Sequence, residues 1–328
     1  MFKKSLLVFS VILLVASTLG VVQSESFTLT LGISEHNYLG ENIFVQGNIT
    51  LNGSPVTDGL VTIQVNDPKD NLFVLRTLTT GNNPPGPWTV EILELITCDM
   101  SGNPKTNFTL GGYLGLKVTL KNNGLSPQHA KVILTLVDSN GLPFKAFVLY
   151  EVDLKGESVE TRTKWPIPIG EDAALGPAFA CVNALNELPE NSGFAYCPEK
   201  SATFNIVSGS SGEAYSVQES QSADTPGKFN LTFSTNPYGG LAGNYTIFAV
   251  SQYYYYFELV NATFQVFLLG DVNGDGKVRV DDVLAVALAF GCDEGDPDWD
   301  PRCDLNGDHK VRVDDVLLAA SNFGKGTD

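Results

Sequence analysis

Basic residues are scarce in this sequence of 328 residues. It holds 20 Lys and Arg against 37 Asp and Glu, a net charge of −17 that becomes −19 if Lys3 and Lys4 leave with an N-terminal signal. A chain this acidic repels phosphate backbones and anionic lipid headgroups. We therefore exclude nucleic acid and anionic membranes as its main partners.

Catalytic motifs are missing as well. The three histidines lie far apart, and the chain contains no Gly-x-Ser-x-Gly, no His-Glu-x-x-His and no Cys-His signature. Paired carboxylates of the kind that glycosidases use leave no mark in a sequence, so an unrecognised hydrolase stays an alternative. The sequence favours a protein that is not an enzyme.

Long apolar runs are absent except at the N-terminus. There Lys3 and Lys4 precede an apolar run over 6–16, and small and polar residues follow up to Ser24. The run is shorter than the roughly 20 residues of a membrane span. It predicts a secretory signal over residues 1–24, with a retained anchor as the alternative. We expect a secreted, cell-surface-associated protein with no membrane span after signal cleavage.

Cysteine is limited to five residues, which an exported chain can pair. Cys181 with Cys197 and Cys292 with Cys303 lie close in sequence, and Cys98 is left over. The alternatives are buried free thiols, or Cys98 taking one of these partners. Asn-x-Ser/Thr sequons suggest a glycosylated ectodomain. They begin at Asn48, Asn52, Asn107, Asn230, Asn244 and Asn261.

Between Ser26 and Phe267 the sequence alternates short β-branched and aromatic runs with Gly, Pro, Asn and Asp. This spacing predicts antiparallel Ig-like β-sandwiches, so the chain should be mainly β. The stretch 173–188 is rich in Ala, Leu and Val and ends at Pro189, which predicts one short helix. An aromatic run, 253–257, predicts a strand with rings on both faces, either packed inside the protein or presented to a sugar.

The strongest pattern is a repeat near the C-terminus. Residues 271–282 read DVNGDGKVRVDD and residues 304–315 read DLNGDHKVRVDD, so the second copy follows the first by 304 − 271 = 33 residues. Calcium takes six to eight oxygen ligands from positions 1, 3, 5, 7, 9 and 12 of such a loop. We predict two calcium ions, held by side chains except at position 7, where a lysine gives its backbone carbonyl. The ligands are Asp271, Asn273, Asp275, Lys277 and Asp282 in one loop and Asp304, Asn306, Asp308, Lys310 and Asp315 in the other.

Three details refine the prediction. Position 9 is Arg279 in the first loop and Arg312 in the second. An arginine side chain has no oxygen, so a water molecule should take that place among the calcium ligands. Position 6 needs a positive φ and is Gly276 in the first loop but His309 in the second, where we expect a cost of roughly 1 kcal/mol. Apolar helices are predicted to follow at 283–290 and 316–323 and to pack together through seven residues, namely Val283, Leu284, Leu288, Phe290, Val316, Leu317 and Phe323.

A calcium loop followed by a helix, without an entering helix, resembles the type I dockerin family of secreted archaeal and bacterial proteins. This resemblance implies a small all-α dockerin-like domain over 269–328 that docks onto a cohesin-like domain. In the family, recognition side chains stand at loop positions 10 and 11, here Val280, Asp281, Val313 and Asp314. Many dockerins carry Ser-Thr there, so self-assembly with copies of the chain stays open.

Two further resemblances organise the β region. Residues 87–207 contain NNGLSPQHAKVILTLVDSNG and resemble the CARDB family of Ig-like adhesion modules. Residues 26–86 and 208–268 resemble the two halves of an MG2-type macroglobulin Ig domain, which implies that the CARDB-like unit is inserted into it. Three units in tandem are the alternative.

Three functions follow from these patterns. We favour a non-catalytic surface or matrix protein that attaches through its calcium-binding tail. A carbohydrate-binding accessory component of a polysaccharide-degrading assembly is the second, because dockerins elsewhere often accompany such enzymes. A hydrolase is the third.

Overall fold

The computed structural model describes residues 25–34, 37–81, 86, 88–209, 225–236 and 240–326. Over these residues the chain is mainly β, with sixteen strands, two α-helices and two short 3₁₀ helices. The prediction of a mainly β protein is therefore confirmed. The predicted signal, residues 1–24, lies outside the described residues. Among the described residues, no helix combines the length and apolar character that a membrane span requires.

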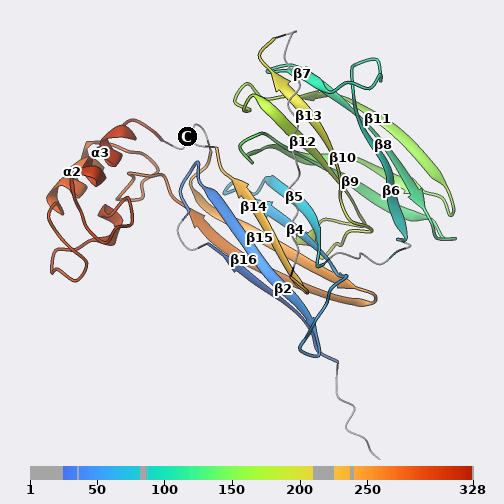
Figure 1. The fold of residues 1–328 in the computed structure, drawn as a ribbon, viewed down its shortest axis with the longest axis horizontal. Helices are drawn as coiled ribbons and strands as arrows, with labels where there is room; N and C mark the ends of the chain where they lie inside the picture. The colour runs from blue at the N-terminus through green and yellow to red at the C-terminus, as the bar shows by residue number, and fades with distance from the viewer. Residues whose placement is uncertain are drawn as a thin grey trace, which may run out of the picture.

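Strands from the two ends of the β region form one sandwich, here called the outer sandwich (Figure 1). Its core consists of inward side chains that alternate with exposed ones, as along β14. One sheet has the order β1 (Phe27–Ile33), β2 (Asn42–Leu51), β14 (Lys228–Ser234), with β3 (Ser54–Pro55) paired to β2. The other has the order β16 (Tyr256–Val266), β15 (Gly243–Tyr253), β4 (Leu60–Asn66), β5 (Leu72–Thr79).

The strands between β5 and β14 form the middle sandwich, which has its own core. Its larger sheet has the order β10 (Pro143–Leu154), β9 (Gln128–Val137), β12 (Gly176–Leu185), β13 (Lys200–Val207), β7 (Asn107–Thr109). Its smaller sheet has the order β11 (Val159–Pro168), β8 (Tyr113–Asn122), β6 (Val90–Cys98). The 3₁₀ helix η1 (Pro189–Asn191) follows β12.

The two sandwiches meet through β5. Leu75 joins Ile133, Leu185 and Ala195 in a small buried cluster, and its backbone exchanges hydrogen bonds with the hydroxyl of Thr135. Beside this cluster, the Arg76 guanidinium donates to both carboxylate oxygens of Glu199, with Nε 2.9 Å from each. Because apolar packing and a charged pair act at the same place, the sandwiches form one joined unit.

The predicted helix over 173–188 is wrong, because this stretch contains strand β12. β12 pairs with β9 on one side and β13 on the other, and most of its residues are buried. A run that is apolar on both faces fits a central strand as well as a helix, so periodicity alone does not separate them.

The tail, residues 269–328, is not the small all-α domain that the sequence predicts. It contains only two short α-helices, α2 (Val280–Leu288) and α3 (Val313–Ser321), and the 3₁₀ helix η2 (Pro301–Cys303). Its other described residues form turns, bends and isolated bridges. Figure 1 shows it at one end of the molecule, away from the middle sandwich. The described chain as a whole is therefore mainly β, and its tail is rich in loops and carries the two short α-helices.

The predicted packing of the two helices is also wrong in most of its residues. Only Val283 and Val316 pack against the tail's core, and the five other predicted contact residues are exposed. Val311, at position 8 of the second loop, belongs to this core instead, and Val278, at position 8 of the first loop, is also buried. The helices begin three residues earlier than predicted, at Val280 and Val313, and Leu284 and Leu317 lie on their exposed sides.

None of the five cysteines takes part in a disulfide in the structure. Cys197 belongs to the core of the middle sandwich together with Ala180 and Val182 of β12. Cys181 lies between those two residues, so strand alternation turns it toward the opposite face of the sheet. This explains why the predicted Cys181–Cys197 bond does not form. Burial and then the charge of Asp300 raise the pKa of Cys303 to about 11, and the nearby Cys292 adds to the rise.

Candidate metal centre

Asp271, at position 1 of the first loop, organises the turn that follows it. Its Oδ1 accepts the backbone N–H groups of Gly274 (2.8 Å) and Asp275 (3.1 Å), and its Oδ2 accepts that of Gly276 (2.8 Å). Further along, the Oδ1 of Asn273 accepts from Asp275, and the Oδ1 of Asp275 accepts from the backbone of Lys277. The loop therefore curls around the side chains of positions 1, 3 and 5.

Asp282, at position 12, closes the loop from the far side. It is 0% exposed, and its Oδ1 accepts the backbone N–H groups of Val272 (3.0 Å) and Asn273 (3.1 Å). Its Oδ2 accepts the N–H of Arg279 at 2.8 Å, directly before α2. One buried carboxylate thus joins the two ends of the loop and caps the helix.

The second loop repeats this network contact for contact. Asp304 accepts from Gly307, Asp308 and His309 as Asp271 does from its own turn. Asp315 is likewise buried and accepts from Leu305, Asn306 and Arg312. Asn306 and Asp308 accept from the backbones of Asp308 and Lys310. Two segments 33 residues apart in sequence therefore have the same conformation.

The two halves of the tail also hold each other. The backbone of Val278, in the first loop, exchanges hydrogen bonds with Gly324 and Lys325 beyond α3. The backbone of Val311, in the second loop, does the same with Gly291 and Cys292 beyond α2. This reciprocal pairing ties each loop to the end of the other repeat.

The donor set of each loop fits calcium in kind, because all its members are carboxylate, amide or carbonyl oxygens. Within the described ranges, however, no three His, Cys, Asp or Glu side chains come together as a group that could hold a metal ion. Burial raises the pKa of Asp271, against the lowering effect of amides from Gly276, Gly274 and Asp275, and the charge of Asp282 raises it further. The two carboxylates therefore repel each other, and a cation between them would remove that repulsion.

Position 6 has the predicted backbone conformation in both loops. Gly276 has φ 82° and His309 has φ 65°, so both lie in the left-handed region. The imidazole Nδ1 of His309 lies 3.1 Å from the Oε2 of Glu294, and this side chain is exposed. The histidine is thus held in a conformation that a glycine adopts without strain.

Replacing His309 with glycine should stabilise the tail by about 0.5–1 kcal/mol, because the left-handed backbone is strained for a residue with a Cβ. The reciprocal change, Gly276→His, should destabilise it by a similar amount and serves as the matched variant. Calorimetric melting of the full chain measures both. A loss of stability in His309→Gly would contradict this account of position 6.

The two position-9 arginines differ, although the sequences around them agree. Arg279 Nη1 lies 3.3 Å from Oδ2 of Asp275, a predicted ligand of its own loop. Arg312 turns away from its loop, donating to the carboxylate of Asp293 at 2.5 Å and to the carbonyl of Cys292. Sequence identity over this stretch gave no sign of the difference, which arises because only Arg312 has an acid on the connecting segment within reach.

The predicted partner-binding residues divide into two kinds. Val280 and Val313 are 72% and 61% exposed at the starts of their helices. Asp281 and Asp314 instead accept hydrogen bonds from the side-chain amides of Asn273 (3.0 Å) and Asn306 (2.7 Å). The valines are available to a partner, whereas the aspartates tie each helix to its own loop.

The aromatic run 253–257 forms a hairpin turn and not one strand. Tyr253 ends β15 and pairs with Tyr256 at the start of β16, while Tyr254 and Tyr255 form the exposed tip. Their rings lie at 77° for Tyr253 with Tyr254 and at 38° for Tyr255 with Tyr256. Phe257 packs on Phe194 of the middle sandwich at 4.7 Å. Tilted rings at a tip do not make the flat platform that sugar stacking needs.

The six sequons differ in exposure. Asn52, Asn230, Asn244 and Asn261 are exposed, whereas Asn48 and Asn107 are partly buried. The Oδ1 of Asn107 also accepts a hydrogen bond from Asn205 at 2.9 Å. The four exposed asparagines are accessible at the surface, which is the first requirement for glycosylation.

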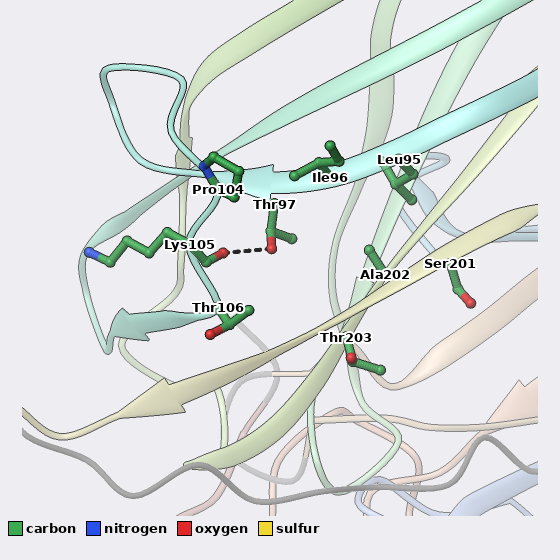
Figure 2. Close-up of a pocket in the computed structure, with 9 residues that line it drawn as sticks. All are labelled: Leu95, Ile96, Thr97, Pro104, Lys105, Thr106, Ser201, Ala202 and Thr203. Atoms are coloured by element: carbon green, nitrogen blue, oxygen red, sulfur yellow. Dashed lines mark hydrogen bonds between the residues drawn. The ribbon is translucent and has the colours of Figure 1, made fainter.

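A hollow of about 550 Å³ lies between β6 and β13 in the middle sandwich (Figure 2). The Thr97 hydroxyl donates to the carbonyl of Lys105 at 2.7 Å across its edge. The lining contains no Asp, Glu, His or Cys, so it lacks the acid and base that hydrolysis needs. It consists of Leu95, Ile96, Thr97, Pro104, Lys105, Thr106, Ser201, Ala202 and Thr203.

No family model matches the chain, and no curated protein sequence matches it. Among solved structures, an alkylpurine DNA glycosylase from Pseudomonas fluorescens is similar over 37% of this chain and 31% of that chain, with 20% identity and a TM-score of 0.28. A β-glucosidase from Listeria innocua is similar over 37% and 17%, with 16% identity and a TM-score of 0.23.

A β-glucuronidase from Bacteroides uniformis is similar over 52% of this chain and 26% of that chain, with 8% identity and a TM-score of 0.28. The chain thus spans less than a third of the length of these proteins. Likeness at this level carries no argument about what the chain does.

Proposed function

We propose that this chain is an exported, non-catalytic surface protein that binds two calcium ions in its tail and attaches through that tail to a cohesin-like domain or to copies of itself. The observation that carries the proposal is the duplicated hydrogen-bond network of the two loops. Identical backbone wrapping around oxygen donors in both repeats is what two equivalent cation sites require. On this proposal the acidic loops bind cations as well as forming turns.

Calcium would be held in the first loop by the side chains of Asp271, Asn273, Asp275 and Asp282 and the carbonyl of Lys277. In the second, it would be held by Asp304, Asn306, Asp308, Asp315 and the carbonyl of Lys310. The ion supplies positive charge at the centre of each loop, where it offsets the carboxylates. A tail with a small core gains stability from such a bound ion.

The exposed apolar side chains of α2 and α3 support the attachment role. Val280 and Leu284 on α2 match Val313 and Leu317 on α3, and all four are exposed. We take these matched apolar side chains as the surface that a partner covers. Calcium would hold both helices in the orientation that presents them.

The β-sandwiches would carry this tail away from the cell surface. The strands before residue 80 pair with strands after residue 227, while the strands between them pair among themselves. This connectivity supports an MG2-like domain, 26–86 and 208–268, with a CARDB-like domain, 87–207, inserted in it. It favours insertion over three units in tandem.

Attachment is tested with the full chain, in calcium and in EDTA, by surface plasmon resonance on an immobilised cohesin domain and by sedimentation velocity for self-assembly. We expect one of the two associations in calcium only. The double variant Leu284→Asp, Leu317→Asp should abolish it, whereas Leu125→Asp, an exposed leucine of the middle sandwich, should leave it unchanged. A monomer that ignores the cohesin domain in calcium would contradict the attachment role.

A further inference from the structure

The outward face of the sheet β1-β2-β14 is a regular array of uncharged polar side chains. Strand register places Gln46 of β2 between Gly32 of β1 and Asn230 of β14. In the next row, Asn48 lies between Thr30 and Lys228. Alternation turns all these side chains away from the sandwich core, which the intervening residues fill.

This face carries little charge. Lys228 is the single charged residue among the outward positions of the three strands, although the chain as a whole carries −17. An uncharged face does not select an ion or a charged polymer. It fits a neutral ligand that forms many hydrogen bonds.

The side chains supply the hydrogen-bonding groups that such a ligand uses. Amides and hydroxyls both donate and accept, as the hydroxyl groups of a sugar do. Some are already oriented, because the Thr30 hydroxyl bonds to Oδ1 of Asn48 and the hydroxyls of Thr28 and Thr50 lie 2.7 Å apart. Oriented polar groups lose less conformational entropy on binding.

Shape and stacking favour the same ligand class. A hollow of about 500 Å³ opens on this sheet beside Gly32, Gln46, Asn48 and Asn230. At one end of the array, opposite Thr232, the ring of Phe44 is 55% exposed and gives a sugar an apolar surface to stack on.

We infer that the outward face of β1-β2-β14 binds a neutral polysaccharide. The chain lies across the three strands, with Gln46, Asn48 and Asn230 hydrogen-bonded to its hydroxyls and Phe44 stacked on one ring. This site is independent of the calcium loops. A protein that attaches through its tail would thus hold a glycan with its outer sandwich.

Two sequons, Asn48 and Asn230, lie on this same face, so the sugar could instead be a covalent N-glycan. The partial burial of Asn48 and the bond between its Oδ1 and the Thr30 hydroxyl favour a binding residue over an acceptor for glycosylation. Mass spectrometry of the chain from its native cells decides between them. A glycan at Asn48 or Asn230 would cover the face and overturn the inference.

Affinity electrophoresis of the full chain, made in a host without N-glycosylation, tests binding in gels that contain a soluble glucan, xylan or galactomannan. We expect retardation by at least one of them, equal in calcium and in EDTA. Gln46→Ala and Phe44→Ala should each weaken the affinity for that polysaccharide about tenfold, because each variant removes one direct contact. Thr263→Ala on β16 and Tyr254→Ala at the hairpin tip are the matched controls and should bind normally.

Several results would overturn the inference. These are no retardation by any neutral polysaccharide, retardation that Gln46→Ala leaves intact, or binding lost in Tyr254→Ala. Retardation that disappears in EDTA would place the sugar at the calcium loops. Because the proposed attachment is measured through the tail, either proposal can fail while the other stands.

Discussion

Replacing Asp282 with alanine is expected to destabilise the tail by about 2–4 kcal/mol and to remove one of its two calcium ions. The buried carboxylate accepts three backbone N–H groups, from Val272, Asn273 and Arg279. Without it these donors are left unsatisfied and α2 loses its cap, with a cost of roughly 1 kcal/mol for each lost interaction. Calorimetric melting in EDTA measures the structural part of the effect.

The variant Asp282→Asn separates the structural role from the metal role. Its amide oxygen still accepts hydrogen bonds, so the melting temperature in EDTA should fall less than it does in Asp282→Ala. The number of calcium ions bound per chain should fall from two to one. The matched control is Asp99→Ala, since Asp99 closes an unrelated turn by accepting from Ser101 and Asn103. Two ions still bound to Asp282→Ala would show that this carboxylate is not a ligand.

Replacing Arg76 with alanine should cost about 3–5 kcal/mol, because it leaves a buried carboxylate without its cation. Glu199 is 2% exposed and Arg76 17%, and Glu199 also accepts the backbone N–H of Thr77 at 3.1 Å. The pair joins β5 of the outer sandwich to the middle sandwich. Its loss should therefore destabilise the contact between the two sandwiches more than either core.

Denaturant unfolding of the full chain measures this effect. Arg162→Ala is the control. It removes an exposed pair with Glu160, together with a hydrogen bond to the carbonyl of Glu151 and a contact with the Tyr150 ring, and should cost only about 1 kcal/mol. The double replacement Arg76→Met, Glu199→Leu should recover most of the lost stability, since matched apolar side chains remove the buried charge. An Arg76→Ala protein as stable as the Arg162→Ala control would contradict the role of the pair.

The sequence predicted the structure correctly where the local residue pattern is compatible with only one backbone conformation. Alternation and turn residues predict strands along most of the β region, and the position-6 requirement predicts positive φ even at His309. The prediction failed where the local pattern fits two conformations and tertiary contacts decide between them. β12 is apolar on both faces, and only its pairing with β9 and β13 makes it a strand.

The candidate site shows the same limit. The loop boundaries follow from Asp271 and Asp282, but the helix start depends on the hydrogen bond between Asp282 and the backbone of Arg279, which no periodicity reveals. Leu284, which the sequence places in the core, is exposed. Likewise, Arg76 and Glu199 are 123 residues apart, and nothing local relates them.

Calorimetric titration of the full chain with calcium tests the central claim most directly. We predict saturation at two ions per chain, with one ion in Asp282→Asn and one in Asp315→Asn. A flat titration, or wild-type stoichiometry in both variants, would contradict it.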